Sequence, residues 1–261
     1  MGKVYLVGAG PGDADLLTVR AARVLARADV VLHDALVSQE VLDLIRSGAE
    51  QIDVGKRCGP KRVSQEEINA LLVAKAVAGD VVVRLKGGDP LIFGRAGEEI
   101  AALRAAEIDF EVIPGITAAA AAAAVARIPL TDRHLASEVV FATGGRGSGF
   151  PSLPGSGLGR RTLVVYMPGT DYGELARKLG EEAWPSNVPC VLVSGANRPG
   201  QELCWTELGG LASTRLLPAP SVLIVGSVAK KPATASGGSR RRELAFPLPV
   251  RSASREKEEW S

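Results

Sequence analysis

Two glycine-rich loops contain the residues of this 261-residue sequence that are best suited to bind a cofactor. The first, residues 8–13 (GAGPGD), follows an apolar run and precedes residues 15–27, whose apolar side chains recur at helical spacing. This order is typical of the dinucleotide fingerprint, in which a helix N-terminus binds a pyrophosphate and an acidic residue about 20 positions later binds the ribose. Asp29 and Asp34 lie near that distance.

Two residues of the first loop argue against a phosphate ligand. Asp13 stands where the fingerprint has its third glycine or an alanine, and its charge would oppose a pyrophosphate at the helix N-terminus. Pro11 removes one backbone N–H that would otherwise bind the anion. The alternatives are a plain strand-to-helix turn or a loop that a ligand without phosphates approaches closely, such as one that carries a sulfonium or an adenosine.

The second loop, residues 86–90 (KGGDP), ends a valine-rich run at residues 80–85. Ligands of open α/β sheets bind at the carboxyl ends of the strands. Gly87 and Gly88 permit positive φ and expose the backbone, and Asp89 offers a carboxylate to a ribose or an amino group. Because both loops follow strands, we expect them at one edge of the sheet, which favours a binding site over a plain turn.

Charged side chains gather beside these loops. Asp34 ends the apolar run that starts at residue 30, in a position suited to a catalytic acid or base. Basic residues form clusters that are individually typical of a solvated surface. Together they favour a polyanionic substrate, such as one with several carboxylates that arginines bind in pairs of hydrogen bonds. They include Lys56, Arg57, Lys61, Arg62, Arg84, Lys86, Arg95, Arg127 and Arg133.

Strand-like and helix-like segments alternate up to residue 113, which predicts a mostly parallel sheet covered on both faces. Within it, Ser64 and Glu67 predict a capping box at the start of a helix. Pro114 and Gly115 then interrupt the chain before an alanine-rich helix at residues 116–127. Further strands and a helix follow up to residue 225. We therefore expect two α/β domains, residues 1–113 and 114–229, and a disordered tail at residues 230–261.

The composition narrows the classes of function. A net charge of +2 and an aromatic content of 4% give no reason to expect a nucleic-acid partner. The three cysteines are far apart and lack CxxC spacing, which argues against a disulfide framework and a zinc site. The longest apolar run, residues 116–126, is too short to span a membrane. We expect a cytoplasmic protein that uses no metal and associates with no membrane.

Longer motifs resemble one family. They are residues 4–13 (VYLVGAGPGD), 30–38 (VVLHDALVS), 55–57 (GKR), 65–69 (QEEIN), 83–99 (VRLKGGDPLIFGRAGEE), 114–118 (PGITA) and 128–131 (IPLT). In order and spacing they resemble the tetrapyrrole methylase family over residues 3–228, and most of all its members that methylate uroporphyrinogen III. Motifs of this length are far more specific than a single glycine loop.

The resemblance implies a dimeric two-domain α/β enzyme with a mostly parallel first sheet, a mixed second sheet and S-adenosylmethionine in the cleft between the domains. It implies methylation of uroporphyrinogen III at positions 2 and 7 to give precorrin-2, a precursor of sirohaem, cobalamin and haem d1. Asp34 matches the family's proposed proton acceptor and Lys56 its proposed proton donor. Substrate carboxylates would bind Arg57, Arg84, Lys86 and Arg95. Cofactor contacts would come from Pro11, Gly87, Gly88, Asp89, Ile92, Thr117, Ala118, Met167 and Ala196.

Some residues depart from the family pattern, chiefly His33 in place of tyrosine and Gly145 in place of histidine. These departures bear on substrate contacts more than on the reaction. Three alternatives stay open. Methyltransferases of later corrin precursors share the GAGPGD turn but usually lack the full second-loop string. A nicotinamide-dependent dehydrogenase would also need a glycine loop, and a non-catalytic carrier would bind the tetrapyrrole without methyl transfer.

Overall fold

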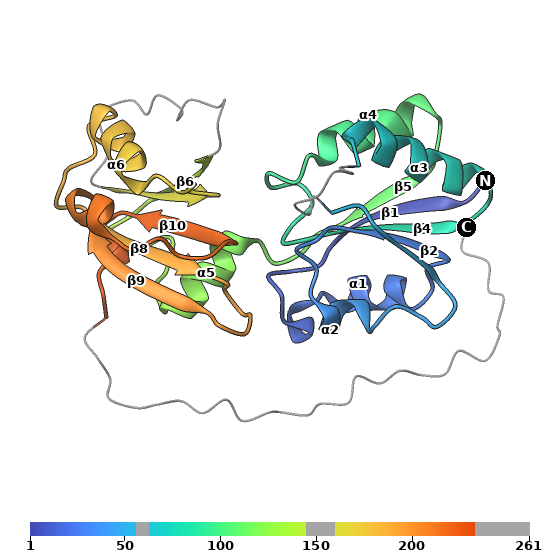
Figure 1. Ribbon diagram of the computed structural model, residues 1–261, viewed down its shortest axis with the longest axis horizontal. Coiled ribbons are helices and arrows are strands. Elements are labelled where there is room, and N and C mark those ends of the chain that lie inside the picture. Colours follow the sequence, from blue (N-terminus) through green and yellow to red (C-terminus); the bar gives the residue numbers. More distant parts are fainter. Residues whose placement is uncertain (56–62, 145–159, 233–261) are drawn as a thin grey trace.

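The computed structural model describes residues 1–55, 63–144 and 160–232. They form two lobes, each built around its own five-stranded sheet (Figure 1). The strands of the first sheet end at Ile113, and the first helix that packs on the second sheet is Ala118–Ala126. Residues 233–261, most of the expected tail, lie outside the described residues, and so do residues 145–159 of the glycine-rich segment.

The first sheet is entirely parallel, which confirms the expected class of fold. Its order is β3-β2-β4-β1-β5. In chain order the strands are β1 (Lys3–Gly8), β2 (Val30–His33), β3 (Glu50–Asp53), β4 (Val81–Lys86) and β5 (Phe110–Ile113). Gly8 pairs with Lys86 at the carboxyl ends of β1 and β4. The two glycine-rich loops therefore leave neighbouring strands at the same level of the sheet.

Helices cover both faces of this sheet. The helices α3 (Gln65–Val77) and α4 (Ala96–Ala105) pack on one face. On the other face lie α1 (Val19–Leu25) and the short α2 (Gln39–Leu42) (Figure 1). The expected capping box starts α3: Ser64 Oγ accepts from the backbone N–H of Glu67, whose carboxylate accepts from the backbone N–H of Ser64. Such a box satisfies two backbone donors that the helix leaves unpaired.

The expectation of one helix over residues 15–27 was wrong. The chain forms a short 3-10 helix, Ala14–Leu16, and only then α1. Asp13 accepts from the backbone N–H of Asp15, and Thr18 accepts from that of Ala21, so each segment has its own cap. Leu17 and Thr18 are extended between them. Side-chain caps at two nearby positions outweighed the helical spacing of the apolar residues.

The second sheet is mixed, as expected, in the order β6-β7-β10-β8-β9. Its strands are β6 (Glu138–Thr143), β7 (Arg161–Tyr166), β8 (Pro189–Ser194), β9 (Glu202–Glu207) and β10 (Ser221–Val225). β6 and β7 are parallel, whereas the other neighbours are antiparallel. The alanine-rich α5 (Ala118–Ala126) packs on one face, and α6 (Tyr172–Glu181) covers the other (Figure 1).

An unexpected 3-10 helix, Leu208–Ser213, also packs beside α6. Its two glycines disfavour a helix by propensity, but Leu208 and Leu211, three residues apart, are both buried in the core. Within the three described segments, no helix is long and apolar enough to cross a membrane.

Candidate active site between the two lobes

The two glycine-rich loops are joined to one another by backbone hydrogen bonds. Gly10 N donates to Gly88 O at 3.2 Å, and Gly88 N donates to Gly10 O at 2.7 Å. Both glycines have positive φ, +67° and +71°, which other residues rarely adopt. The expectation that the loops share one edge of the sheet is therefore confirmed, and the hydrogen-bonded pair lies where the first lobe meets the second.

The entry to the second lobe passes directly over this unit. A Cβ atom at Gly115 would lie 2.3 Å from Gly88 O, and one at Gly8 would lie 2.5 Å from Gly115 N. Asp89 anchors the crossing, because its Oδ2 accepts from Gly115 N at 3.1 Å while its Oδ1 accepts from Leu91 N at 2.9 Å. Asp89 was expected to bind a ribose or an amino group. In the structure it also accepts hydrogen bonds that attach the second loop to the lobe crossing.

Thr117 and Ala118 follow at the start of α5, where they meet Tyr166 at the end of β7. Thr117 Oγ1 and Tyr166 Oη lie 2.5 Å apart, and the same Tyr166 oxygen accepts from Ala119 N at 3.3 Å. Burial raises the pKa of the Tyr166 phenol above its ordinary value. The Phe93 ring packs on Tyr166 with 4.9 Å between the ring centroids, so the segment after the second loop contacts the second lobe.

Large apolar side chains are exposed around the loops. Leu91 and Met167 are 59% and 55% exposed, and Leu36 and Phe93 are nearly as open. Phe93 and Met167 also have positive φ, at 52° and 49°, a strained conformation for residues with a side chain. Exposed apolar side chains and local strain, both in the segments that follow strands, are typical of a binding surface.

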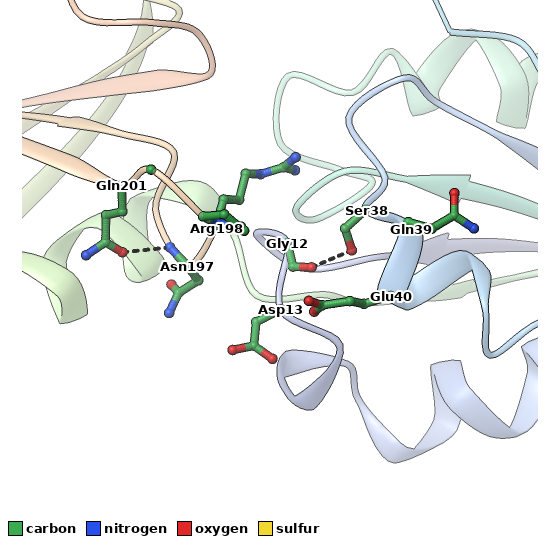
Figure 2. A pocket seen from close by; sticks show the side chains of 10 residues that line it. Gly12, Asp13, Ser38, Gln39, Glu40, Asn197, Arg198 and Gln201 are labelled. Carbon is green, nitrogen blue, oxygen red and sulfur yellow. Dashed lines mark hydrogen bonds between the residues drawn. The ribbon is translucent and has the colours of Figure 1, made fainter. Parts of the chain in front are cut away.

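A pocket of about 760 Å³ opens between the lobes (Figure 2). Its walls are residues 12–13 and 38–40 of the first lobe and residues 197–201 of the second. None of the site residues expected from the sequence lines it, but Gly12 follows Pro11 and Asn197 follows Ala196. Arg198 spans the pocket's edge: its Nε donates to Pro11 O at 2.8 Å and its Nη2 donates to Leu36 O.

Arg198 and Tyr166 were not expected at the site. Arg198 lies in a polar turn, residues 195–200 (GANRPG), which resembles an ordinary surface loop. Tyr166 ends a valine-rich strand and is indistinguishable from a core aromatic residue. Their roles depend on contacts with segments distant in the sequence. Ile92 and Ala196, by contrast, were expected at the site and pack against the core between α5 and the second sheet.

Arg84 and Lys86, which were expected to bind substrate carboxylates directly, are paired with a carboxylate of the protein itself. Both side chains are 3% exposed and bind the fully buried Glu99 of α4. Arg84 Nε lies 2.9 Å from Glu99 Oε1, and Lys86 Nζ lies 2.9 and 3.0 Å from the two carboxylate oxygens. Arg84 Nη2 also donates to Asp34 Oδ1. Burial, followed by the charge of Arg84, lowers the pKa of Lys86 below its ordinary value.

The remaining expected substrate ligands have different positions. Arg95 is exposed just before α4 and donates two hydrogen bonds, both of 2.7 Å, to Glu98. Lys56 and Arg57 lie outside the described residues. The described part of the chain contains no group of three or more histidine, cysteine or acidic side chains placed to hold a metal ion.

Comparison with known proteins places this geometry in a family. Residues 3–212 match the family of Tetrapyrrole (Corrin/Porphyrin) Methylases. The siroheme synthase of Actinobacillus pleuropneumoniae serotype 7 (strain AP76) is 46% identical over 233 residues, which are 88% of this chain and 48% of that protein. The chain thus spans about half the length of the curated relatives it matches.

Two solved structures are similar to most of this chain. The uroporphyrin-III C-methyltransferase of Thermus thermophilus, complexed with S-adenosyl homocysteine, is 39% identical with a TM-score of 0.75, covering 87% of this chain and 98% of that one. A cobalt precorrin-4 methyltransferase is 28% identical with the same TM-score, covering 87% and 96%. Residues 3–212, which match the family model, include both glycine-rich loops, Gly115 and Tyr166. The chain belongs to the tetrapyrrole methylase family.

Proposed function

We propose that this chain is an S-adenosylmethionine-dependent C-methyltransferase. It converts uroporphyrinogen III to precorrin-2 by methylation at positions 2 and 7, a step towards sirohaem and cobalamin. The observation that carries the proposal is the hydrogen-bonded pair of glycine loops, Gly10 with Gly88, at the junction of the lobes. A relative at 39% identity binds S-adenosyl homocysteine on the same fold and is a uroporphyrin-III C-methyltransferase.

The residues at the junction fit this methyl donor. S-adenosylmethionine supplies a methyl group that its sulfonium already activates, so the pocket needs neither a phosphate site nor a metal. Glycines in the paired loops leave backbone N–H and C=O groups open to close approach, and Met167 presents an exposed apolar surface. We propose that the donor contacts Pro11, Gly87, Gly88, Asp89, Ile92, Thr117, Ala118, Met167 and Ala196.

The chain's own part in the reaction is orientation and proton transfer. Holding two reactants in line removes much of the entropic barrier to their reaction. A methylated ring carbon leaves the macrocycle with an excess positive charge, which the loss of one proton neutralises. Asp34, 31% exposed at the end of β2, is the proposed acceptor of that proton. We propose Lys56 as the proton donor, and Arg57 and Arg95 as ligands of the substrate carboxylates.

The direct test is incubation with uroporphyrinogen III and methyl-labelled S-adenosylmethionine under reducing, oxygen-free conditions. We expect two labelled methyl groups per tetrapyrrole, and Asp34→Ala to slow the transfer by about 100-fold or more while S-adenosylhomocysteine still binds. A folded, cofactor-binding protein that transfers no label contradicts the proposal. Binding of the macrocycle without transfer indicates a carrier, and transfer only to a later precorrin indicates a sister enzyme.

We further propose that the protein acts as a homodimer in the cytoplasm. The family resemblance supports the dimer. The cysteines support a reducing compartment, because Cys190 and Cys204 are both free thiols. Light scattering during size-exclusion chromatography measures the mass: a dimer is expected, and a monomer mass at micromolar concentration contradicts this proposal.

A further inference from the structure

Glu99 is a buried carboxylate that the proposed reaction does not use. It lies on α4 with its side chain fully buried, between two buried cations of β4. Arg84 and Lys86 are two residues apart on β4, so both project to the face that α3 and α4 cover. With Asp34 at the other end, the charges alternate in the order Lys86, Glu99, Arg84, Asp34.

Only one end of this network reaches solvent. Asp34 is 31% exposed, whereas the other three side chains are at most 3% exposed. Burying charges costs free energy that apolar side chains of similar volume avoid. A purely structural role would not need the network to end at an accessible carboxylate, and that carboxylate is the proposed proton acceptor.

The guanidinium of Arg84 is oriented from several sides. Its Nε is bound to Glu99, and its Nη1 lies 3.4 and 3.3 Å from the backbone oxygens of Leu32 and Leu85. Its Nη2 is left to contact Asp34 Oδ1. Glu99 is itself held by Gln65 of α3, whose Nε2 donates at 3.3 Å. The position of the Asp34 carboxylate therefore follows from where Glu99 holds Arg84.

We propose that Glu99 is a positioning residue for methyl transfer: acting through Arg84, it fixes the Asp34 carboxylate at the solvent-exposed end of the network. This inference rests on the proposed function, in which Asp34 accepts a proton. Without the charge of Glu99, the Nε edge of Arg84 is free to turn and bind both oxygens of Asp34 as a fork. The carboxylate is then drawn into the sheet and away from the ring that it must deprotonate.

Glu99→Gln tests this, because glutamine keeps the shape of the side chain and removes its charge. We expect kcat to fall by about tenfold and the KM for the tetrapyrrole to stay within about twofold, since misplacing a catalytic group slows the chemical step more than binding. S-adenosylhomocysteine binding, measured by calorimetry, should be unchanged.

The matched control is Glu138→Gln, which removes the carboxylate partner of the mostly buried Arg161 in the second lobe. The kcat of this variant should equal that of the wild type.

A double-mutant cycle with Asp34→Ala separates positioning from a structural role. If Glu99 acts through Asp34, then adding Glu99→Gln to Asp34→Ala should change the single-turnover rate by less than about twofold. An independent further tenfold loss overturns the inference. Arg84→Lys is the second variant, because lysine keeps the buried charge but lacks the planar fork, and it should show the same dependence on Asp34.

The outcomes also separate this inference from the proposed function. A wild-type protein that transfers no methyl group overturns both. An active wild type whose Glu99→Gln and Arg84→Lys variants lose S-adenosylhomocysteine binding along with kcat overturns the inference alone, because the network then maintains the fold rather than Asp34. The inference is supported if Glu99→Gln and Arg84→Lys lower kcat in the wild-type protein but have no further effect when Asp34→Ala is also present.

Discussion

Arg198 of the second lobe donates a hydrogen bond of 2.8 Å from its Nε to the backbone oxygen of Pro11 in the first lobe. The same guanidinium donates to the backbone oxygen of Leu36. Its stem packs so closely on the first loop that a Cβ at Gly12 would lie 2.6 Å from Arg198 Cγ. One side chain thus links the loops that follow β1 and β2 to the turn that follows β8.

We expect Arg198→Met to weaken the binding of S-adenosylhomocysteine by about tenfold, because methionine keeps the packing of the stem but loses hydrogen bonds worth about 1 kcal/mol each. Calorimetry gives the dissociation constant. Arg215→Met is the control, since Arg215 pairs with Glu202 on the surface of the second lobe. Equal dissociation constants for Arg198→Met and the wild type would show that this link does not support the cofactor site.

Gly115→Ala should destabilise the protein and impair cofactor binding together. Its methyl group would lie 2.3 Å from Gly88 O, so the backbone of the second loop must move. Overpacking of this kind typically costs about 1–3 kcal/mol, which urea unfolding can measure. Gly97→Ala on α4 has no atom within 4 Å of the added carbon and should stabilise by about 0.5–1 kcal/mol. Equal effects of the two substitutions would contradict the close packing at Gly115.

Asp89→Ala removes the acceptor of two backbone N–H groups, those of Leu91 and Gly115. We expect about tenfold weaker binding of S-adenosylhomocysteine, because the loop loses its attachment to the lobe crossing. Asp89→Asn keeps one carbonyl acceptor and should fall between the wild type and alanine. An unchanged dissociation constant in Asp89→Ala means that the second loop is not part of the cofactor site.

Because of Cys190, the free energy of unfolding should depend on pH in the alkaline range. Burial raises the pKa of its thiol from 9.0 to about 12. The unfolded chain loses this proton near pH 9 while the folded protein keeps it, so the free energy of unfolding falls as pH rises from about 9 to 12. The slope for this one group is at most about 1.4 kcal/mol per pH unit. Urea unfolding at pH 9–10.5 should show that the free energy of unfolding falls less steeply with pH in Cys190→Val than in the wild type. Parallel pH dependences of the two proteins would contradict the raised pKa of Cys190.

Much of the fold could be predicted because each element carries its own signal. β5 and β10 are short, mostly apolar runs that end before Pro114 and Gly226, and the start of α3 follows from Ser64 and Glu67. The meeting of the two glycine loops followed from topology, because the carboxyl ends of parallel strands share one edge. The split of residues 15–27 was missed, because two local caps interrupted a continuous helical pattern.

The site was predictable in its location and less so in the roles of its residues. Arg84 and Lys86 alternate with apolar residues in a buried strand, a pattern that indicates a buried partner within the protein. Their partner Glu99 stands beside Glu98 in sequence, yet one is buried and the other is exposed, a difference that depends on how α4 is turned against the sheet. Arg198 acts on Pro11 across 187 positions, a distance over which no local pattern extends.

The two sheets share no strand, and all five strands of the first sheet precede residue 114. Figure 1 shows the chain passing from the first lobe to the second at the segment before α5. Domains generally fold as units, the N-terminal one first during synthesis, so the first sheet and its helices can assemble before the second sheet is complete. We expect the second lobe to complete its fold against the surface that the paired glycine loops provide.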